Sequence, residues 1–306
     1  MQAKVVIVGS LNMDLVTRLP RLPRPGETLA GQSFVTVPGG KGANQAVAAA
    51  RLGASVAMIG CVGADAYGQQ LRDGLLAEGI DCTGVTVIAE QPSGVATILV
   101  DDHSQNAIVI VAGANGQLTT ALVDSFEALL SQAEVIICQL EVPLDSVAHV
   151  LKRARELGKS VILNPAPASA PLPAGWYPLI DYLIPNESEA SVLSGGLAVD
   201  SVASADVAAS ALLAAGAAKV IVTLGAQGSL FATRAQSRHF PAPAVQAVDT
   251  TAAGDTFVGG FAAALAEGKS EAAAINFGQI AAALSVTRAG AQPSIPTLAD
   301  VQGFAS

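Results

Sequence analysis

Short apolar runs alternate along most of the chain with longer segments in which Ala and polar residues recur. The first run, 5–8, is apolar at every position, which is typical of a strand buried on both faces of a sheet. The same pattern predicts strands at 56–61, 85–88, 135–138, 160–163, 182–184 and 220–223. It predicts helices at 42–52, 68–78, 144–157, 187–193, 203–215, 254–267 and 271–286. Strands alternating with helices predict an α/β fold with a mainly parallel sheet, which binds ligands at the edge where its strands end.

Two segments, 12–38 and 94–111, depart from this pattern. The first contains four prolines between residues 20 and 38, which exclude a central strand and favour short edge strands. In the second, two β-prone runs, 94–100 and 107–111, flank a polar turn, which predicts a hairpin. We expect both segments to form a small sheet that stands off the main body. The chain shows no internal repeat and no long linker, so one domain is predicted.

Composition and charge exclude several classes of protein. Of the 306 residues, 51% are hydrophobic and 13% are charged, against about 25% charged in an average globular protein. Such a chain has the apolar surface that a disordered protein lacks. The formal net charge is −9, so the basic footprint of a nucleic-acid-binding protein is missing and no nucleic-acid partner is expected.

The apolar segments and the cysteines bear on location. The most apolar stretch, 272–286, contains Asn276 and Gln279 and is shorter than the roughly 20 apolar residues of a membrane span. No membrane partner is therefore expected. The cysteines, at positions 61, 82 and 138, lack CxxC spacing, which favours buried thiols in a reducing compartment. These observations predict a soluble, cytoplasmic protein.

The segment 248–257 is the strongest candidate for chemistry, because small residues run directly into a predicted helix. The N–H groups of a first helical turn have no partner within the helix, and together with the helix dipole they can bind an anion. Asp255 could then accept a proton from a hydroxyl while those N–H groups hold a phosphoryl group, as phosphoryl transfer requires. The spacing is equally compatible with an acidic residue that only favours the helix start.

A second candidate is the glycine-rich segment 38–46 around Lys41. It lacks the GxxxxGK[ST] spacing of a Walker A motif, so it is either a set of backbone donors for a polar ligand or a plain tight turn. Asn12, Asp14 and Glu141 follow predicted strands at the edge where ligands bind. Isolated polar residues at such places are also common as helix caps or solvated loop residues.

Other segments give weaker signals. Residues 185–189 follow a strand but are also typical of an ordinary helix start with acidic residues in its first turn. Residues 225–228 are typical of a turn between two strands. His103 and His239 lie in predicted surface turns and are given no role. The first strand is not followed by GxGxxG, which argues against a dinucleotide-dependent oxidoreductase.

Five separated motifs occur in a fixed order along the chain. They are GGKGANQA at 39–46, NPAP at 164–167, PNESE at 185–189, TLGAQG at 223–228 and DTTAAGDTF at 249–257. With the tail 287–294, they resemble the ribokinase-like (PfkB-type) carbohydrate kinase family over essentially the whole chain. The resemblance implies a three-layer α/β/α fold with a mainly parallel central sheet and a small β-sheet lid. It also implies transfer of the γ-phosphoryl group of ATP to O5 of D-ribose.

The resemblance further implies a role for individual residues. Asp255 would be the general base, and the backbone N–H groups of Ala252, Ala253, Gly254 and Asp255 would form the anion hole. D-ribose would contact Asn12, Asp14, Gly40, Lys41, Asn44, Glu141 and Asp255. ATP would contact Asn186, Thr223, Gly225, Gly228, Gly254 and Gln279, of which Gln279 departs from the His or Asn usual in close relatives.

Cofactors and assembly also follow from the resemblance. Mg²⁺ would bridge the phosphates of ATP, with Glu189 in its outer shell. A monovalent cation, K⁺, would be held by oxygens of Asp249, Thr251, Ser285, Arg288, Gly290 and Ser294. The single domain 1–306 would carry its lid on segments 12–38 and 94–111, and the lid would pair with that of a second copy in a homodimer.

Two alternatives remain at this point. The first is another kinase of the same family, acting on fructose, adenosine or deoxyribose, which a panel of substrates would distinguish. The second is a sugar-binding or regulatory protein that has kept the fold without catalysis. Binding of ribose and ATP without turnover would support that second alternative.

Overall fold

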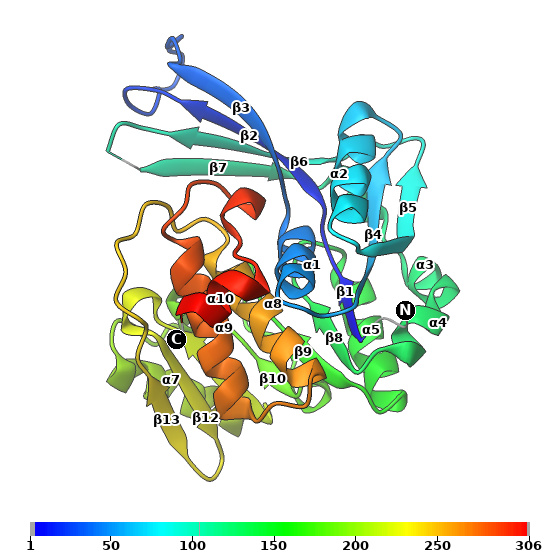
Figure 1. Ribbon diagram of the computed structural model, residues 1–306, viewed down its shortest axis with the longest axis vertical. Coiled ribbons are helices and arrows are strands. Elements are labelled where there is room, and N and C mark those ends of the chain that lie inside the picture. The colour runs from blue at the N-terminus through cyan, green and yellow to red at the C-terminus, as the bar shows by residue number, and fades with distance from the viewer. Residues whose placement is uncertain (1–3, 104, 305–306) are drawn as a thin grey trace.

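The computed structural model describes residues 4–103 and 105–304, and a nine-stranded sheet lies at the centre of this part (Figure 1). Its strand order is β13-β12-β11-β10-β9-β8-β1-β4-β5, and the neighbours pair in parallel except for β11–β12 and β12–β13. The strands are β1 (Val5–Val8), β4 (Val56–Gly63), β5 (Asp81–Ile88), β8 (Val135–Cys138), β9 (Ser160–Leu163), β10 (Tyr182–Leu183), β11 (Lys219–Thr223), β12 (Ser229–Thr233) and β13 (Ser237–Phe240). The predicted α/β class with a mainly parallel sheet is confirmed.

Helices cover both faces of this sheet. One face carries α1 (Lys41–Arg51), α2 (Ala66–Ala77), α8 (Ala253–Ala266) and α9 (Glu271–Ser285). The other carries α3 (Thr120–Ser125), α4 (Glu127–Gln132), α5 (Leu144–Glu156), α6 (Glu187–Leu193) and α7 (Val202–Ala214). Successive residues of β1 face opposite layers: Val5 and Ile7 pack with α1 and α8, whereas Val6 and Val8 pack with α5. Both faces of β1 are therefore buried, as its unbroken apolar run predicts.

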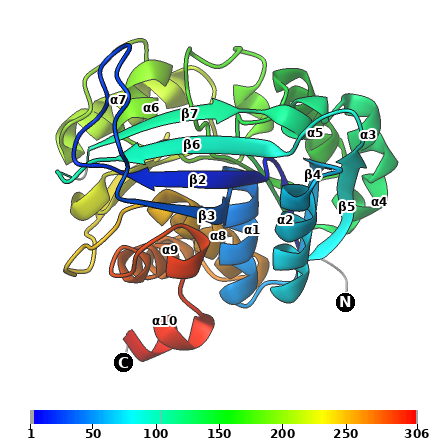
Figure 2. The same ribbon diagram turned by 90° about the horizontal axis from the view of Figure 1, so that it is seen from above.

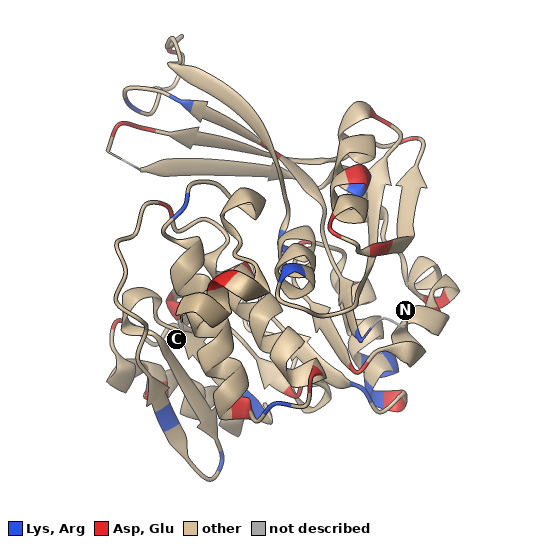
Figure 3. Cartoon of the chain, viewed as in Figure 1, with Lys and Arg blue, Asp and Glu red and all other residues tan. Residues whose placement is uncertain are grey.

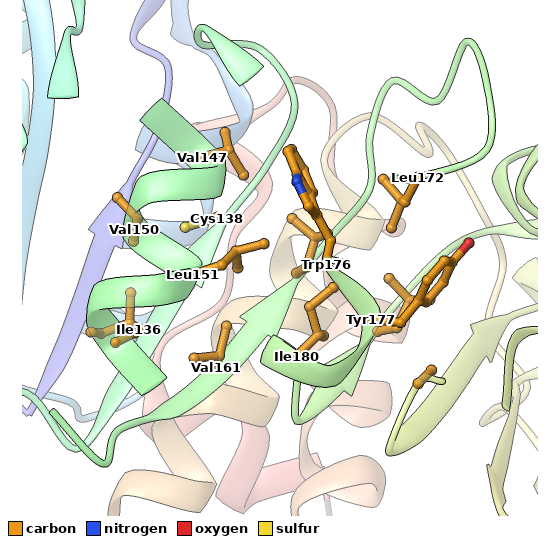
Figure 4. Close-up of a cluster of buried hydrophobic side chains, with 14 of the residues drawn as sticks. Ile136, Cys138, Val147, Val150, Leu151, Val161, Leu172, Trp176, Tyr177 and Ile180 are labelled. Atoms are coloured by element: carbon orange, nitrogen blue, oxygen red, sulfur yellow. The ribbon is translucent and has the colours of Figure 1, made fainter. Parts of the chain in front are cut away.

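The core under α5 consists almost entirely of aliphatic and aromatic side chains. Val147, Val150 and Leu151 of α5 pack on β8 and β9 and against Trp176, next to the 3₁₀ helix η2 (Tyr177–Leu179) (Figure 4). On the opposite layer the last helix, α10 (Leu298–Phe304), buries Val301 against α9. These two cores hold the ends of the sheet strands in fixed positions.

A second, four-stranded sheet projects from the main body (Figure 1), and Figure 2 shows this sheet from above. Charged residues are sparse along its strands (Figure 3). It consists of β2 (Asn12–Arg18), β3 (Ser33–Gly39), β6 (Gly94–Val100) and β7 (Asn106–Val111), in the order β3-β2-β6-β7. The small sheet and its β6–β7 hairpin are confirmed, although residue 104 of the hairpin turn lies outside the described residues. β3 runs into α1 through Gly40 alone, whose φ of 87° is a conformation that glycine adopts without strain.

The expectation of only short edge strands in 12–38 is wrong for β2. This strand has seven residues and lies between β3 and β6. The prolines do not interrupt it, because Pro20, Pro23 and Pro25 fall in the connection that follows and Pro38 lies on the edge strand β3.

Other differences from the predicted elements are small. The helices α3, α4 and α10 and the strand β13 were not expected, because each is too short to show a clear period. Cys61, Cys82 and Cys138 are free and buried, as expected, and burial raises the pKa of the Cys138 thiol to about 12. Among the described residues, no helix has both the length and the apolar character of a membrane span.

Candidate active site

The predicted motifs meet at the carboxyl edge of the central sheet, where β1, β8, β9, β10 and β11 end. A pocket of about 160 Å³ lies at this edge. It is lined by Lys41, Asn164, Ala166, Ile184, Asn186, Glu189, Thr223, Ala252, Gly254, Asp255 and Val258. All five motifs that were singled out in the sequence contribute to this lining, and the two other residues, Ile184 and Val258, are each adjacent to a motif. The pocket is smaller than the roughly 300–1,000 Å³ that encloses a whole ligand. Its volume is enough for the reacting groups of a ligand, so we interpret it as the centre of a longer site.

Asp255 lies in the first turn of α8 and is buried against α1. Its Oδ2 accepts a hydrogen bond from Asn44 Nδ2 at 3.0 Å, and its Oδ1 accepts one from Gln45 Nε2 at 2.9 Å. Burial raises the pKa of this carboxyl, and the charge of Lys41 and the two amide donors oppose the rise. A carboxylate has about four lone-pair sites, so two remain for a ligand. Asp255 is thus held by two side chains of α1. An acidic residue that only stabilised the start of its own helix would not need these contacts.

The start of α8 offers unpaired donors. Ala252 precedes the helix with a φ of 59°, in the left-handed region, which is uncommon for a residue with a side chain. The N–H of Ala253 donates to the carbonyl of Thr250 at 3.2 Å. Among the described residues, the N–H groups of Gly254 and Asp255 have no bonded acceptor. A β-carbon at Gly254 would meet nothing within 4 Å, so this positive helix end faces open space in which an anion fits.

The start of α1 packs against the segment that follows β1. A β-carbon at Gly40 would lie 2.7 Å from the backbone nitrogen of Asn12, so no other residue fits there. Glu141 Oε2 accepts hydrogen bonds from Ser10 Oγ at 2.6 Å and from the N–H of Lys41 at 3.2 Å. Glu141 therefore caps α1 from another part of the chain, and this bonding leaves its second oxygen, Oε1, for other partners.

Asp14 and Lys41 form the charged part of the site. Asp14 is buried on β2 of the small sheet, so it is neither a helix cap nor a solvated loop residue, the alternative that the sequence left open. Burial raises its pKa to about 7, reinforced by the charges of Glu141 and Asp255 and opposed by Lys41. Burial opposes the charged form of Lys41, but four carboxylates, those of Asp255, Glu141, Glu189 and Asp14, together raise its pKa. The lysine thus stays an ammonium in a site rich in hydrogen-bond acceptors.

Asn12 is oriented by Asn115, a residue that sequence reasoning missed. Asn115 lies in the 3₁₀ helix η1 (Gly113–Gln117) and is fully buried. It accepts from the N–H of Leu11 at 2.9 Å, and its amide donates to the carbonyl of Leu11 at 3.0 Å and to Asn12 Oδ1 at 2.8 Å. The amide nitrogen of Asn12 is left to face a ligand. Nothing local in the sequence links two residues about a hundred positions apart.

The motif 185–189 is both a helix start and a wall of the pocket. Asn186 Oδ1 accepts from the N–H of Glu189 at 2.8 Å, and Glu189 Oε2 accepts from the N–H of Asn186 at 2.9 Å, forming a capping box for α6. Burial raises the pKa of Glu189, while the Asn186 N–H and Lys41 oppose the rise. The helix-start interpretation and the ligand-binding interpretation of this motif are therefore compatible.

Three of the residues expected to contact ATP, namely Gly225, Gly228 and Gln279, do not line this pocket. Gly225 and Gly228 form the turn between β11 and β12 that their sequence predicts. Gln279 is buried on α9, where its amide donates to the carbonyls of Phe240 and Pro241 and accepts from Ser229 Oγ at 2.7 Å. The described structure brings Thr223 and Asn186 into the pocket, but it does not bring Gln279, Gly225 or Gly228 there.

Residues expected at a cation site lie beside the start of α8. Asp249 Oδ1 accepts from the N–H and the hydroxyl of Thr251, and its Oδ2 accepts from the N–H of Gly290 at 2.8 Å. Burial opposes ionisation of Asp249, but these hydrogen bonds outweigh it and lower its pKa. The hydroxyls of Ser285 and Ser294 donate to carbonyls one turn earlier. The guanidinium of Arg288 pairs with Asp300 at 3.4 Å.

Comparison with known proteins places this geometry in a family. The chain matches the pfkB family of carbohydrate kinases over residues 2–298. It is 45% identical over 304 residues to ribokinase from Haemophilus influenzae, covering 99% of each chain. It is 38% identical over 302 residues to deoxyribokinase from Salmonella typhi, covering 99% of this chain and 98% of the relative. The structure of Arabidopsis thaliana ribokinase complexed with ribose and ATP matches with a TM-score of 0.93 and 34% identity, over 99% of each chain. The resemblance drawn from the motifs is confirmed.

Proposed function

Because the chain belongs to the pfkB family of carbohydrate kinases, we propose that it transfers the γ-phosphoryl group of ATP to O5 of D-ribose and forms D-ribose 5-phosphate. The observation that carries this proposal is the position of Asp255. Its carboxylate is fixed by Asn44 and Gln45 at the start of α8, directly beside the open space at Gly254. One place thus offers a proton acceptor and a site for a transferring phosphoryl group.

In this mechanism Asp255 accepts the proton of the O5 hydroxyl as that oxygen attacks the γ-phosphorus. A positioned general base contributes about 10²–10⁴ in rate. The N–H groups of Gly254 and Asp255, with those of Ala252 and Ala253 at the same helix start, form the anion hole for the phosphoryl oxygens. Lys41, which also lines the pocket, adds positive charge there. Phosphoryl transfer depends mainly on such positioning and charge stabilisation.

The sugar is proposed to lie between β2 and the start of α1. Its hydroxyls would donate to the carboxylates of Asp14 and Glu141 and accept from the amide of Asn12, the ammonium of Lys41 and the backbone at Gly40. Asn44 supports this placement independently. Its Oδ1 is buried without a hydrogen-bond partner while its Nδ2 binds Asp255, and a sugar hydroxyl would supply the missing donor.

ATP is proposed to extend from the pocket along the ends of β10 and β11. Asn186, Thr223, Gly225, Gly228, Gly254 and Gln279 are the residues assigned to it. Mg²⁺ fits beside Glu189, because carboxylate oxygen is a ligand that hard cations prefer and this side chain lines the pocket. Bound with ATP, the ion would neutralise charge on the phosphates. Glu189 would hold the water molecules around the ion.

A monovalent cation, K⁺, is proposed at the cluster beside α8. The proposed oxygens belong to Asp249, Thr251, Ser285, Arg288, Gly290 and Ser294. The donor set fits such an ion because it consists of carboxylate, hydroxyl and carbonyl oxygens, and the lowered pKa of Asp249 keeps its carboxylate charged. Two members of the cluster, Asp249 and Thr251, are hydrogen-bonded to each other and lie just before the start of α8 in the sequence. An ion there would add positive charge beside the anion hole.

The four-stranded sheet is proposed to be a lid on the single domain 1–306, formed by segments 12–38 and 94–111. Closing over the sugar would exclude water and suppress hydrolysis of ATP. The lid carries exposed apolar side chains on its two edge strands, β3 and β7, among them Phe34 (60% exposed) and Val109 (64% exposed). Such surface favours pairing with the lid of a second copy. Sedimentation equilibrium tests this homodimer, and a monomer mass at micromolar concentration would contradict it.

The cytoplasm remains the proposed location. The three free, buried cysteines are compatible with a reducing compartment. Fractionation of cells that produce the protein would test this, and recovery with a membrane or secreted fraction would contradict it.

Deoxyribose is the second candidate substrate, favoured by the 38% identity with the Salmonella deoxyribokinase. The test is ADP release in a coupled assay with MgATP and K⁺, comparing ribose, deoxyribose, fructose, adenosine and no sugar. Turnover greatest with ribose supports the proposal. A greater kcat/KM with another sugar would make that sugar the substrate in place of ribose. Binding of ribose and ATP without turnover on any sugar would instead support a silent sugar-binding protein.

A further inference from the structure

Behind Asp255 lies a chain of three buried amides, of which the proposed reaction uses only the contact of Gln45 with the carboxylate. Gln45 Nε2 donates to Asp255 Oδ1 at 2.9 Å and to Asn164 Oδ1 at 3.0 Å. Gln45 Oε1 accepts from Gln139 Nε2 at 2.5 Å. Asn164 Nδ2 donates to the backbone carbonyl of Ile184 at 2.9 Å. The amides come from α1, from the residue after β8 and from the residue after β9, so the chain joins three elements of the fold.

The direction of these hydrogen bonds is fixed from one end. The carbonyl of Ile184 can only accept, so the nitrogen of Asn164 must face it and the oxygen of Asn164 must face Gln45. The nitrogen of Gln45 then faces both Asn164 and Asp255, which leaves its oxygen for Gln139. Reversing Gln45 would place its oxygen against the oxygens of Asn164 and Asp255. The backbone of Ile184 thus determines that a donor, and not an acceptor, faces the carboxylate.

Gln139 supports this interpretation independently. Its own Oε1 is buried without a hydrogen-bond partner in the described structure. A buried amide oxygen without a donor is unfavourable, yet the opposite orientation would bring two oxygens together at Gln45. Gln139 is also held closely, since a β-carbon at Gly9 would lie 1.9 Å from its Oε1. The Oε1 atom of Gln139 therefore stays without a partner, and the direction of the hydrogen bonds along the three amides is kept.

We propose that Gln45, Gln139 and Asn164 are positioning residues, which keep the Asp255 carboxylate ionised and oriented to accept the proton of the sugar hydroxyl. The inference rests on the proposed role of Asp255 as the base. Gln139 touches neither the pocket nor Asp255 and acts only through Gln45. It is therefore the residue at which a positioning role can be tested without altering a contact of the substrates.

The charges that face Asp255 set the direction of the expected effect. Lys41 on α1 favours the ionised form, whereas Glu141 after β8, Asp14 on β2 and Glu189 on α6 disfavour it. The Asn44 and Gln45 amides add to the effect of Lys41. Removing the donor at Gln45 leaves burial and the neighbouring carboxylates less opposed. The pKa of Asp255 should then rise, and the base should lose its proton only at higher pH.

The test uses Gln139→Met, which keeps the length of the side chain and removes its donor, and Gln139→Glu, which places an acceptor against Gln45 Oε1. The kcat is measured against pH at saturating ribose and MgATP. We expect the acid limb of the profile to move up by about one pH unit in both variants, with the KM for ribose within about twofold of the parent. Val147→Ala, in the core under α5, is the matched control for loss of stability and should leave the limb unchanged.

Two results would overturn the proposal: an acid limb in Gln139→Met at the same pH as in the parent, or an equal shift in Val147→Ala. A second measurement separates this inference from the proposed function. The ¹³C resonance of the Asp255 carboxyl, assigned by its loss in Asp255→Asn, is titrated without substrates in the parent and in Gln139→Met. If no sugar is phosphorylated, the proposed function fails, and the NMR titration still shows whether the amides control the carboxyl. Equal titration midpoints in the two proteins would contradict that control.

Discussion

Replacing Asp255 by Asn is the most direct test of the site, because the structure predicts that the fold accepts the change. The new amide must face two donors, Asn44 Nδ2 and Gln45 Nε2, and it has only one oxygen. Gln45 is fixed in direction through Asn164, so the oxygen of residue 255 should remain on that side. Asn44 has an unpartnered Oδ1 and can reverse to accept from the new amide nitrogen. Both hydrogen bonds to residue 255 are then kept, and the amide nitrogen of Asn44 takes the unpartnered position of its oxygen, where a sugar hydroxyl can accept from it.

The magnitudes follow from the same geometry. Loss of the base should lower kcat by about 10²–10⁴, which corresponds to about 2.7–5.5 kcal/mol in the barrier at 1.36 kcal/mol per tenfold. Stability should be unchanged or higher, because a buried carboxyl with a raised pKa is replaced by a neutral amide. Ribose affinity should change by less than about tenfold, since one hydrogen bond to a charged group is altered and the reversed Asn44 donates to the sugar hydroxyl instead of accepting from it.

The assays are coupled ADP release for kcat, calorimetric titration for ribose affinity and thermal melting for stability. Asp145→Asn is the matched control, because Asp145 is also an acidic residue in a first helical turn, that of α5, but it is exposed and does not line the pocket. It should leave kcat within twofold. A kcat for Asp255→Asn within tenfold of the parent would refute the role of Asp255 as base. A large fall in melting temperature would refute the reasoning about Asn44.

Three further predictions concern the rest of the site. Gly254→Ala should lower kcat/KM for MgATP at least tenfold without changing the melting temperature, because the new methyl group meets no protein atom and fills the space proposed for the phosphoryl group. The KM for ribose should rise as the pH falls through about 7, because Asp14, with a pKa near that value, is a stronger acceptor for sugar hydroxyls when it is ionised; Asp14→Asn should remove this dependence. Replacing K⁺ by Na⁺ should lower kcat several-fold, and Arg51→Met should raise the K⁺ concentration needed for half-activation, because Arg51 holds the carbonyls of Gln292 and Ile295 next to the proposed cation residues.

For each of these three predictions there is a result that would contradict it. Unchanged kinetics in Gly254→Ala would place the phosphoryl group elsewhere. A ribose KM that is flat between pH 6 and 8 would remove Asp14 from the titration. Equal rates in K⁺ and Na⁺ would argue against the cation site, and a loss of melting temperature without a change in K⁺ dependence would give Arg51 a purely structural role.

The sheet and its helices could be predicted from the sequence because parallel strands buried on both faces are apolar throughout. β8 and β9 begin and end at the predicted residues for this reason. The central position of β2 could not be predicted, because the prolines near it lie in the connection that follows the strand. Propensity shows which residues form a strand, but the neighbours of a strand depend on contacts between distant segments.

The same distinction applies to the site. Asp255 and Lys41 stand in local patterns that point to phosphate chemistry, and the pocket contains both. Asn115 and Gln139 were missed because neither belongs to a recognisable motif, and the partner of each lies about a hundred residues away. A residue that contacts a ligand often belongs to a motif, whereas one that orients it is recognised only when the fold brings the two together.

The passage from β3 to α1 through Gly40 has a mechanical consequence. Pro38 and Gly39 belong to the outer strand of the small sheet, and Asn44 and Gln45, which hold Asp255, lie within the first turns of the helix that follows. Because only one residue separates the strand from the helix, the connection between them is short. Any rotation of the small sheet must be absorbed by the backbone of Gly40 or transmitted as torque to the two amides on the carboxylate. Movement of the small sheet is therefore coupled to the alignment of Asp255 to the extent that Gly40 does not absorb it.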